Sequence, residues 1–67
     1  MIQGKLTYIS GLVLCVDGVE YKATRGVRVT KGFHPVTKPI HLSDLKNGDT
    51  VQLFGPPKGD LHTINVR

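Results

Sequence analysis

Hydrophobic and polar residues alternate with a period of two over much of the chain, and this pattern is typical of half-buried β-strands. Residues 2–9 predict a first strand with Leu6 and Tyr8 on one face and Ile9 on the other. The continuous apolar run at 12–16 predicts a strand that is covered on both sides. Shorter runs predict further strands at 19–24, 27–30, 50–54 and 61–67.

Asp17-Gly18 is the strongest local turn signal in the chain. A two-residue type I′ turn needs positive φ at both central positions, and Asp followed by Gly tolerates that conformation. The pair therefore predicts a β-hairpin over residues 12–24. In its second strand, the alternation predicts these inward side chains: Val19, Tyr21 and Ala23.

Glycine and proline mark the connections between the other strands. Lys31–Pro39 contains two prolines and one glycine, so it predicts a loop. Ser43 is in position to be the N-cap of a single helical turn at 43–46. Asn47–Asp49 predicts a turn into the next strand, and residues 55–60 predict another loop.

Together these elements predict an all-β chain with six short strands and at most one helical turn near residues 43–46. Short strands separated by turn residues are typical of small sandwiches and barrels, and we expect a five- to six-stranded OB/SH3-like barrel. We expect the 67 residues to form a single domain, 1–67. A chain of this length buries only about 60% of the surface that its unfolded form exposes, which is enough for one core. A large concave pocket with convergent polar groups needs more chain, which argues against most enzyme scaffolds.

Positive charge is concentrated in one part of the chain. Nine basic and five acidic residues give a net charge of +4. Residues 21–42 contain five basic residues and no acidic one, while the rest of the chain has four basic and five acidic residues. Within this window Arg28 should point outward, because Val27 and Val29 are predicted to share a buried face. Such a basic segment indicates either an anionic partner or only a well-solvated loop.

Two motifs, in this order, resemble a bacterial family of small barrel domains of unknown function. The first runs from Gly4-Lys5-Leu6 through the apolar stretch Leu12–Val16 to Asp17-Gly18-Val19-Glu20-Tyr21, and the second is Leu42-Ser43-Asp44-Leu45-Lys46-Asn47-Gly48-Asp49-Thr50-Val51. The resemblance covers nearly the whole chain and implies a small closed or partly closed barrel without catalytic residues. The basic segment is not part of the shared pattern, and the export signal common in that family is not expected here. In size and β-rich layout, the chain is more loosely similar to small single-strand-binding proteins of phages.

No motif in the chain predicts catalysis, a metal site or a cofactor. Cys15, His34, His41 and His62 do not have the spacing of zinc-binding motifs. Because Cys15 lies within the apolar run at 12–16, we expect a buried, unreactive thiol. The acidic residues are scattered among turns, which leaves no carboxylate pair for acid–base catalysis. The sequence therefore predicts a protein that is not an enzyme.

Single-stranded nucleic acid is the partner that the basic segment favours. OB-like barrels bind single strands through a basic groove and through aromatic side chains on which bases stack. Phe33 is the aromatic residue of the predicted loop, and Tyr8 and Tyr21 are further stacking candidates. The predicted interface for single-stranded DNA or RNA consists of Lys22, Arg25, Arg28, Lys31, Phe33, His34 and Lys38.

A protein-interaction module is the alternative to nucleic-acid binding. An edge strand of a small barrel can pair with another chain, and the basic segment would then meet an acidic surface and raise the association rate. The chain would be a small accessory or inhibitory protein, such as those that phages encode, or it would form a homodimer. With no apolar stretch of about 20 residues and no signal-peptide pattern, we expect a cytoplasmic protein without membrane contact.

Overall fold

The computed structural model describes residues 2–33, 36–56 and 59–67. Strands make up 69% of the chain and helical residues 5%. The strands are β1 (Ile2–Ser10), β2 (Val13–Val16), β3 (Val19–Phe33), β4 (Val36–Pro39), β5 (Thr50–Phe54) and β6 (Leu61–Val66), and one 3-10 turn, η1, spans Leu42–Asp44. The predicted all-β class with a single helical turn is confirmed.

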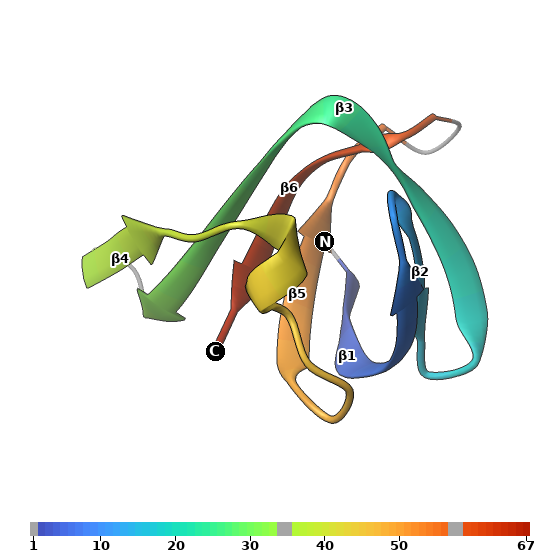
Figure 1. The fold of residues 1–67 in the computed structure, drawn as a ribbon, viewed down its shortest axis with the longest axis horizontal. Coiled ribbons are helices and arrows are strands. Elements are labelled where there is room, and N and C mark those ends of the chain that lie inside the picture. The colour runs from blue at the N-terminus through green and yellow to red at the C-terminus, as the bar shows by residue number, and fades with distance from the viewer. Residues whose placement is uncertain (1, 34–35, 57–58) are drawn as a thin grey trace.

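Five of these strands close into a barrel (Figure 1). They are hydrogen-bonded in the order β2-β1-β5-β6-β3, and β3 also pairs with β2, so the first and last strands of this order meet. β3 and β6 run parallel, while the other neighbours in the barrel are antiparallel. β4 pairs with β3 as one extra strand outside the barrel. The predicted five- to six-stranded barrel is therefore confirmed.

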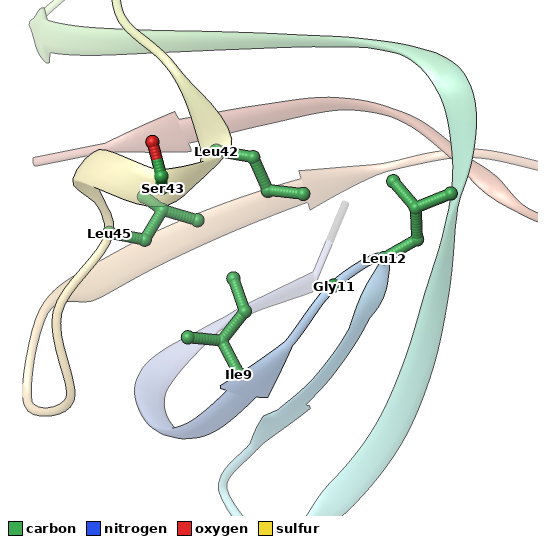
Figure 2. A pocket seen from close by; sticks show the side chains of 6 residues that line it. All are labelled: Ile9, Gly11, Leu12, Leu42, Ser43 and Leu45. Carbon is green, nitrogen blue, oxygen red and sulfur yellow. The ribbon is translucent and has the colours of Figure 1, made fainter.

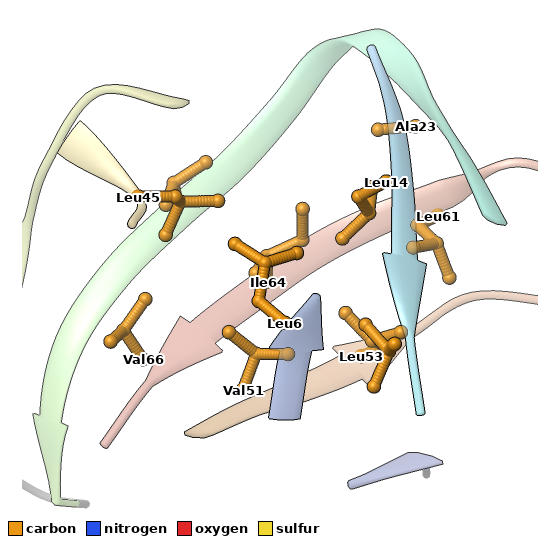
Figure 3. Close-up of a cluster of buried hydrophobic side chains, with 11 residues drawn as sticks. Leu6, Leu14, Ala23, Leu45, Val51, Leu53, Leu61, Ile64 and Val66 are labelled. Atoms are coloured by element: carbon orange, nitrogen blue, oxygen red, sulfur yellow. The ribbon is translucent and has the colours of Figure 1, made fainter. Parts of the chain in front are cut away.

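Aliphatic side chains from every strand of the barrel fill its interior (Figure 3). Leu6, Leu14, Leu53 and Ile64 are each at most 1% exposed. Burying a side chain of this size contributes about 1.5–3 kcal/mol to stability. Leu45, which follows η1, is 6% exposed and belongs to the same cluster. The remaining buried members are Val16, Ala23, Val29, Val51, Leu61 and Val66.

The turn at Asp17-Gly18 has the predicted conformation. φ is 51° at Asp17 and 81° at Gly18, and Val16 pairs with Val19 across the turn. The turn is also attached to β1. The Lys5 N–H donates a hydrogen bond of 3.0 Å to the Asp17 carboxylate, and the Asp17 N–H donates one of 3.0 Å to the Lys5 carbonyl.

The predicted faces of β1 are wrong beyond Leu6. Leu6 pairs with Val16, but the next pair joins Tyr8 to Cys15, so Thr7 is an extra residue on β1. Such a bulge reverses the alternation that follows it. Tyr8, predicted to share the face of Leu6, is 54% exposed, and Ile9 packs against the core instead.

β2 is covered more completely on one face than on the other. Leu14 and Val16 are buried, whereas Val13 and Cys15 are half-buried. The predicted two-sided burial of this strand, and of the Cys15 thiol, is therefore wrong. In β3, Ala23 is buried and Tyr21 packs against the core as predicted, but Val19 is 52% exposed where the strand leaves the turn.

β3 is a single strand of 15 residues where the sequence predicts two. Its pairing with β6 passes from Ala23–Leu61 directly to Arg28–Thr63, with a register shift between them. β3 can therefore leave β2 at one end of the barrel and join β6 at the other without ending. Figure 1 shows this strand as the arch over the top of the barrel.

The prediction of a loop over Lys31–Pro39 is wrong. β3 continues through Phe33 and pairs antiparallel with β4, from Thr30–Pro39 to Phe33–Val36. Gly32 has a φ of 120°, a conformation that favours glycine. Proline is tolerated on an edge strand, so neither residue ends the pairing. Residues 34–35 lie outside the described residues.

η1 begins one residue earlier than predicted, with His41 and not Ser43 at its N-cap. The His41 N–H donates a hydrogen bond of 3.0 Å to the Asp44 carboxylate. Leu42 and Leu45 pack the turn against the barrel core. The apolar contacts and the acceptor at Asp44 account for the earlier start, since both depend on the turn beginning at Leu42.

The predicted turn at 47–49 is present and is joined to β1. Gly48 has a φ of 96° and its N–H donates a hydrogen bond of 2.6 Å to the Leu6 carbonyl. The Leu6 N–H in turn donates to the Asp49 carbonyl over 2.8 Å. The chain therefore enters β5 in register with β1, which is the neighbour that β5 needs to close the barrel.

Polar side chains form a hydrogen-bonded row on the outer face of four strands. The Thr30 hydroxyl donates to Asn65 Oδ1 over 2.8 Å. Asn65 Nδ2 donates to Gln52 Oε1 and Gln52 Nε2 to Gln3 Oε1, both over 3.2 Å. Asn65 is 8% and Gln52 9% exposed, although both alternate with core residues along their strands. This row links β3, β6, β5 and β1 on the side away from the core.

Candidate nucleic-acid interface

The end of β3 and the whole of β4 form a two-stranded arm that extends beyond the barrel (Figure 1). We define the arm as residues 30–33 and 36–39. All four residues of β4 are exposed. The acid-free basic segment of the sequence therefore includes a projecting β-hairpin and not a loop lying on the surface.

Register brings three of the predicted interface residues onto one face of the arm. Lys31 is directly opposite Lys38, and Phe33 is directly opposite Val36. Because side chains alternate along a strand, these two pairs share a face. Phe33 is 63% and Val36 81% exposed. The face thus presents an aromatic ring, an aliphatic side chain and two ammonium groups to solvent.

The ring of Phe33 has a cationic neighbour that is not among the interface residues predicted from the sequence. The guanidinium carbon of Arg67 lies 4.9 Å from the ring centroid, within the range of a cation–π interaction. The Arg67 N–H donates to the Thr50 carbonyl over 2.9 Å, so the backbone of this residue is held against β5. Arg67 is far from Phe33 in sequence, and only the pairing of β3 with β6 brings the two together.

The other predicted cations lie elsewhere along β3. Arg28 is exposed between half-buried Val27 and buried Val29, which confirms its predicted outward direction. It is on the opposite face of the strand from Lys31. Lys22 pairs with Val13 near the β2–β3 turn and is exposed. Arg25 is exposed, in the part of β3 between the Ala23–Leu61 and Arg28–Thr63 pairs. His34, the last predicted residue, lies outside the described residues.

The length of β3 keeps these cations from forming one cluster. Lys22 and Lys31 are nine positions apart on β3, which arches over the barrel (Figure 1). Lys22 pairs with β2, whereas Lys31 pairs with β4 and β6. The described cations of the basic segment 21–42 therefore form a small group on the arm and single positions along the rest of β3.

The two tyrosines offer a weaker platform for stacking than Phe33. Tyr21 is half-buried against the core. Tyr8 is 54% exposed, but its partner in β2 is Cys15, and Cys15 pairs with Glu20 on the next strand. A carboxylate in the same cross-strand row repels phosphate, whereas the arm carries no acidic residue.

The described residues contain no group of three or more His, Cys, Asp or Glu side chains that could hold a metal ion. Cys15 is a free, half-buried cysteine whose carbonyl accepts a hydrogen bond of 3.1 Å from the Thr7 hydroxyl. In the part of the chain that the structure describes, no helix is long and apolar enough to cross a membrane.

Comparison of the chain with protein-family models, with curated proteins and with solved structures found no match.

Proposed function

We propose that this chain is a binding module without catalytic activity that binds single-stranded nucleic acid through the arm. The observation that carries the proposal is the shared face of Lys31, Lys38 and Phe33, with Phe33 63% exposed. Stacking of a base on an aromatic side chain is worth about 1–3 kcal/mol and tolerates any base, because every base has a π-face. Two ammonium groups in the row beside the ring supply contacts to a phosphate next to that base.

The lysine pair gives a second reason to expect a polyanion. Like charges directly opposite each other on neighbouring strands destabilise a sheet. Lys31 and Lys38 have this arrangement on an exposed face. A phosphate that bridges both ammonium groups removes their repulsion. Binding of such a ligand should therefore also stabilise the arm.

The architecture also supports this ligand class. Five-stranded barrels of the OB type bind oligonucleotides and oligosaccharides on the face of two neighbouring strands and on the adjoining loops. The exposed side chains of Lys22, Arg25 and Arg28 extend from the arm along β3.

Pairing of β4 with a strand of another protein is the less favoured alternative. The Ile40 N–H donates to the Val29 carbonyl over 2.9 Å, which makes this a hydrogen-bonded pair in the antiparallel ladder. By alternation, the backbone groups of Thr37 and Pro39 point away from β3. Pro39 has no N–H, so Thr37 is the β4 residue that can donate to an added strand.

A salt titration of binding to a fluorescent oligothymidine tests the proposal. The counterion-release slope of log K against log salt is roughly −0.7 per phosphate contact on single strands. Lys31 and Lys38 of the arm, with Arg67 beside the Phe33 ring, therefore predict about −2. Engagement of Lys22, Arg25 and Arg28 as well predicts a slope of about −4. We expect Lys31→Ala/Lys38→Ala to weaken binding and to make the slope shallower by about 1.4.

A matched double variant controls for net charge. Lys5→Ala/Lys46→Ala removes the same number of positive charges from exposed positions outside the arm. It should leave the slope nearly unchanged. Absence of binding at low salt, or equal effects of the two double variants, would contradict the proposal.

Substitution of Phe33 separates stacking from charge. Phe33→Leu keeps an apolar side chain but removes the ring, and it should weaken binding roughly 5- to 150-fold, the equivalent of one stacked base. Phe33→Trp should retain binding. Because the chain contains no tryptophan, the fluorescence of this variant reports only on the arm, and stacking of a base should quench it.

A further inference from the structure

An open apolar pocket of about 440 Å³ lies between η1 and the connection from β1 to β2. Its lining residues are Ile9, Gly11, Leu12, Leu42, Ser43 and Leu45. In Figure 2, the leucines of the η1 segment face the same space as Ile9 and Leu12 on the other side. Only Ser43 contributes a polar side chain. The chemistry of this site suits an apolar side chain and not a polar ligand.

We propose that this pocket receives Phe33 and Val36 from the arm of a second copy of the chain, in a reciprocal dimer. Within one copy, both side chains are largely exposed, at 63% and 81%, so the arm does not fill its own pocket. An apolar cavity of about 150 Å³ is large enough to hold a benzene ring. The pocket therefore has room for the Phe33 ring and for the Val36 side chain beside it.

Charge complementarity favours the arm as the occupant. Asp44 is the last residue of η1, is exposed, and is adjacent in sequence to Ser43 and Leu45, which line the pocket. Its carboxylate accepts the His41 N–H, but it has no cationic partner among the described side chains of its own copy. On the arm, Lys31 and Lys38 form the cross-strand pair on the same face as the apolar pair Phe33–Val36. Insertion of the arm brings two ammonium groups to a carboxylate.

The size of the chain makes association advantageous. A single cysteine excludes an intrachain disulfide, and the described residues contain no metal-binding cluster. Chains of this length commonly gain stability from disulfides, metals or oligomerisation. Because Pro39 removes a donor from the free edge of β4, we assign the contact to side chains of the arm and not to an added strand.

The dimer and the proposed nucleic-acid site share Phe33, so each excludes the other. A copy whose arm lies in its partner's pocket has no exposed ring for stacking. Single-stranded nucleic acid should therefore convert dimers to monomers. The pocket, in contrast, has no part in the proposed nucleic-acid interface, and this difference allows the two proposals to be tested separately.

Sedimentation equilibrium of nucleic-acid-free protein, from about 1 μM to about 1 mM, tests the dimer. We expect a reversible monomer–dimer equilibrium in the wild type. Phe33→Ala/Val36→Ala and, separately, Leu12→Lys should each raise the dissociation constant by at least about tenfold. Lysine at position 12 keeps an aliphatic stem against the pocket and adds a charge that repels the incoming arm.

The matched control is Tyr8→Ala/Val19→Ala. It removes two side chains of similar exposure, 54% and 52%, from a surface outside the arm and the pocket. This variant should dimerise like the wild type. Asp44→Asn keeps an acceptor for the His41 N–H but removes the charge, and it should weaken the dimer to a smaller degree and only at low salt.

Mixing the two defective variants identifies the reciprocal arrangement. A copy without an arm still has an intact pocket, and a copy with a blocked pocket still has an intact arm, so the mixture should form a heterodimer through one contact. A wild type that stays monomeric throughout overturns the proposal. A dimer that survives both variants, or that is lost in the Tyr8→Ala/Val19→Ala control, also overturns it.

Oligonucleotide binding by Leu12→Lys keeps the two proposals distinguishable. The arm is intact in this variant, so its affinity for oligothymidine should equal or exceed that of the wild type. Normal oligonucleotide binding by a chain that never dimerises overturns the dimer alone. Dimerisation through the arm without oligonucleotide binding overturns the proposed function alone.

Discussion

Lys31 on β3 and Lys38 on β4 are directly opposite each other, and their side chains share one exposed face of the arm. No acidic residue occurs between positions 21 and 42 to balance them. The repulsion between the two ammonium groups destabilises the isolated chain, and a bound anion would relieve it. Its effect on stability can be measured without any ligand.

Replacement of Lys38 by Gln should stabilise the protein at low ionic strength. The change removes the like-charge pair, which is worth about 0.2–1 kcal/mol across neighbouring strands. At 1 M salt, where the Debye length is about 3 Å, the gain should disappear. Urea unfolding at low and high salt measures the difference, with Lys46→Gln as a control that should show no gain. A gain that is independent of salt would mean that repulsion is not its cause.

Gly4→Ala should destabilise the barrel by roughly 1–3 kcal/mol, the range for overpacking a well-filled site. A Cβ at position 4 would lie 2.7 Å from the Asp17 carboxyl carbon and 2.8 Å from Val16 Cγ1. Asp17 is hydrogen-bonded to the Lys5 backbone through both its carboxylate and its own N–H, so it cannot move away without losing these bonds. Chemical denaturation measures the loss.

Gly26→Ala is the matched control for that substitution. A Cβ at Gly26 meets no atom within 4 Å, and the residue does not have positive φ. Its effect should stay within about 0.5 kcal/mol. Equal losses at the two positions would show that the contact with Asp17 does not determine the result.

The sequence predicts elements well where local chemistry decides them. Asp17-Gly18 has the predicted turn because two adjacent residues contain all that a type I′ turn requires. The arm is different. Gly32 and Pro39 are ordinary loop residues, and their tolerance here depends on β4 being an edge strand, a fact of tertiary pairing. The bulge at Thr7 is likewise a property of the β1–β2 register and leaves no mark in the alternation of β1.

The candidate site shows the same division. Basic composition identifies Lys31 and Lys38, and local context identifies Phe33, but their shared face follows from a register that the sequence does not reveal. Arg67 could not be found at all, since its approach to Phe33 depends on the parallel pairing of β3 with β6. Non-local strand pairing therefore decides which residues of the basic segment can act together.

Asp17→Ala should lower the free energy of unfolding by roughly 2 kcal/mol. Alanine loses the acceptor for the Lys5 N–H and is strained at the φ of 51° that Asp17 adopts. For a domain of this size, the loss corresponds to a decrease in Tm of about 10 °C. Asp17→Asn is the control, because asparagine tolerates positive φ and its amide oxygen can accept the same bond. Circular dichroism melting curves compare the three proteins, and equal losses for both variants would contradict this account.

The polar row on the outer face gives the last prediction. Asn65 Nδ2 donates to the Gly32 carbonyl over 3.1 Å and to Gln52 Oε1 over 3.2 Å, while Asn65 is only 8% exposed. Asn65→Asp replaces this donor with a second acceptor oxygen that faces two acceptors. We expect a loss of roughly 3 kcal/mol at neutral pH, since a shielded charge without its donors is costly.

The pH dependence of Asn65→Asp has a defined sign. Partial burial and the neighbouring acceptors should raise the pKa of the introduced carboxyl above its unfolded value of about 3.9. Folding then favours the protonated form of the carboxyl. The loss of stability relative to the wild type should therefore be smallest below the unfolded-state pKa of about 3.9, and it should grow as the pH rises from there through the folded-state pKa. Urea unfolding of both proteins over a pH series measures this difference. Gln3→Glu is the control, because the exposed Gln3 acts as an acceptor toward Gln52 Nε2 and a carboxylate can replace it. A loss at Asn65→Asp that does not change with pH would mean that the missing donor, and not the buried charge, accounts for the whole effect.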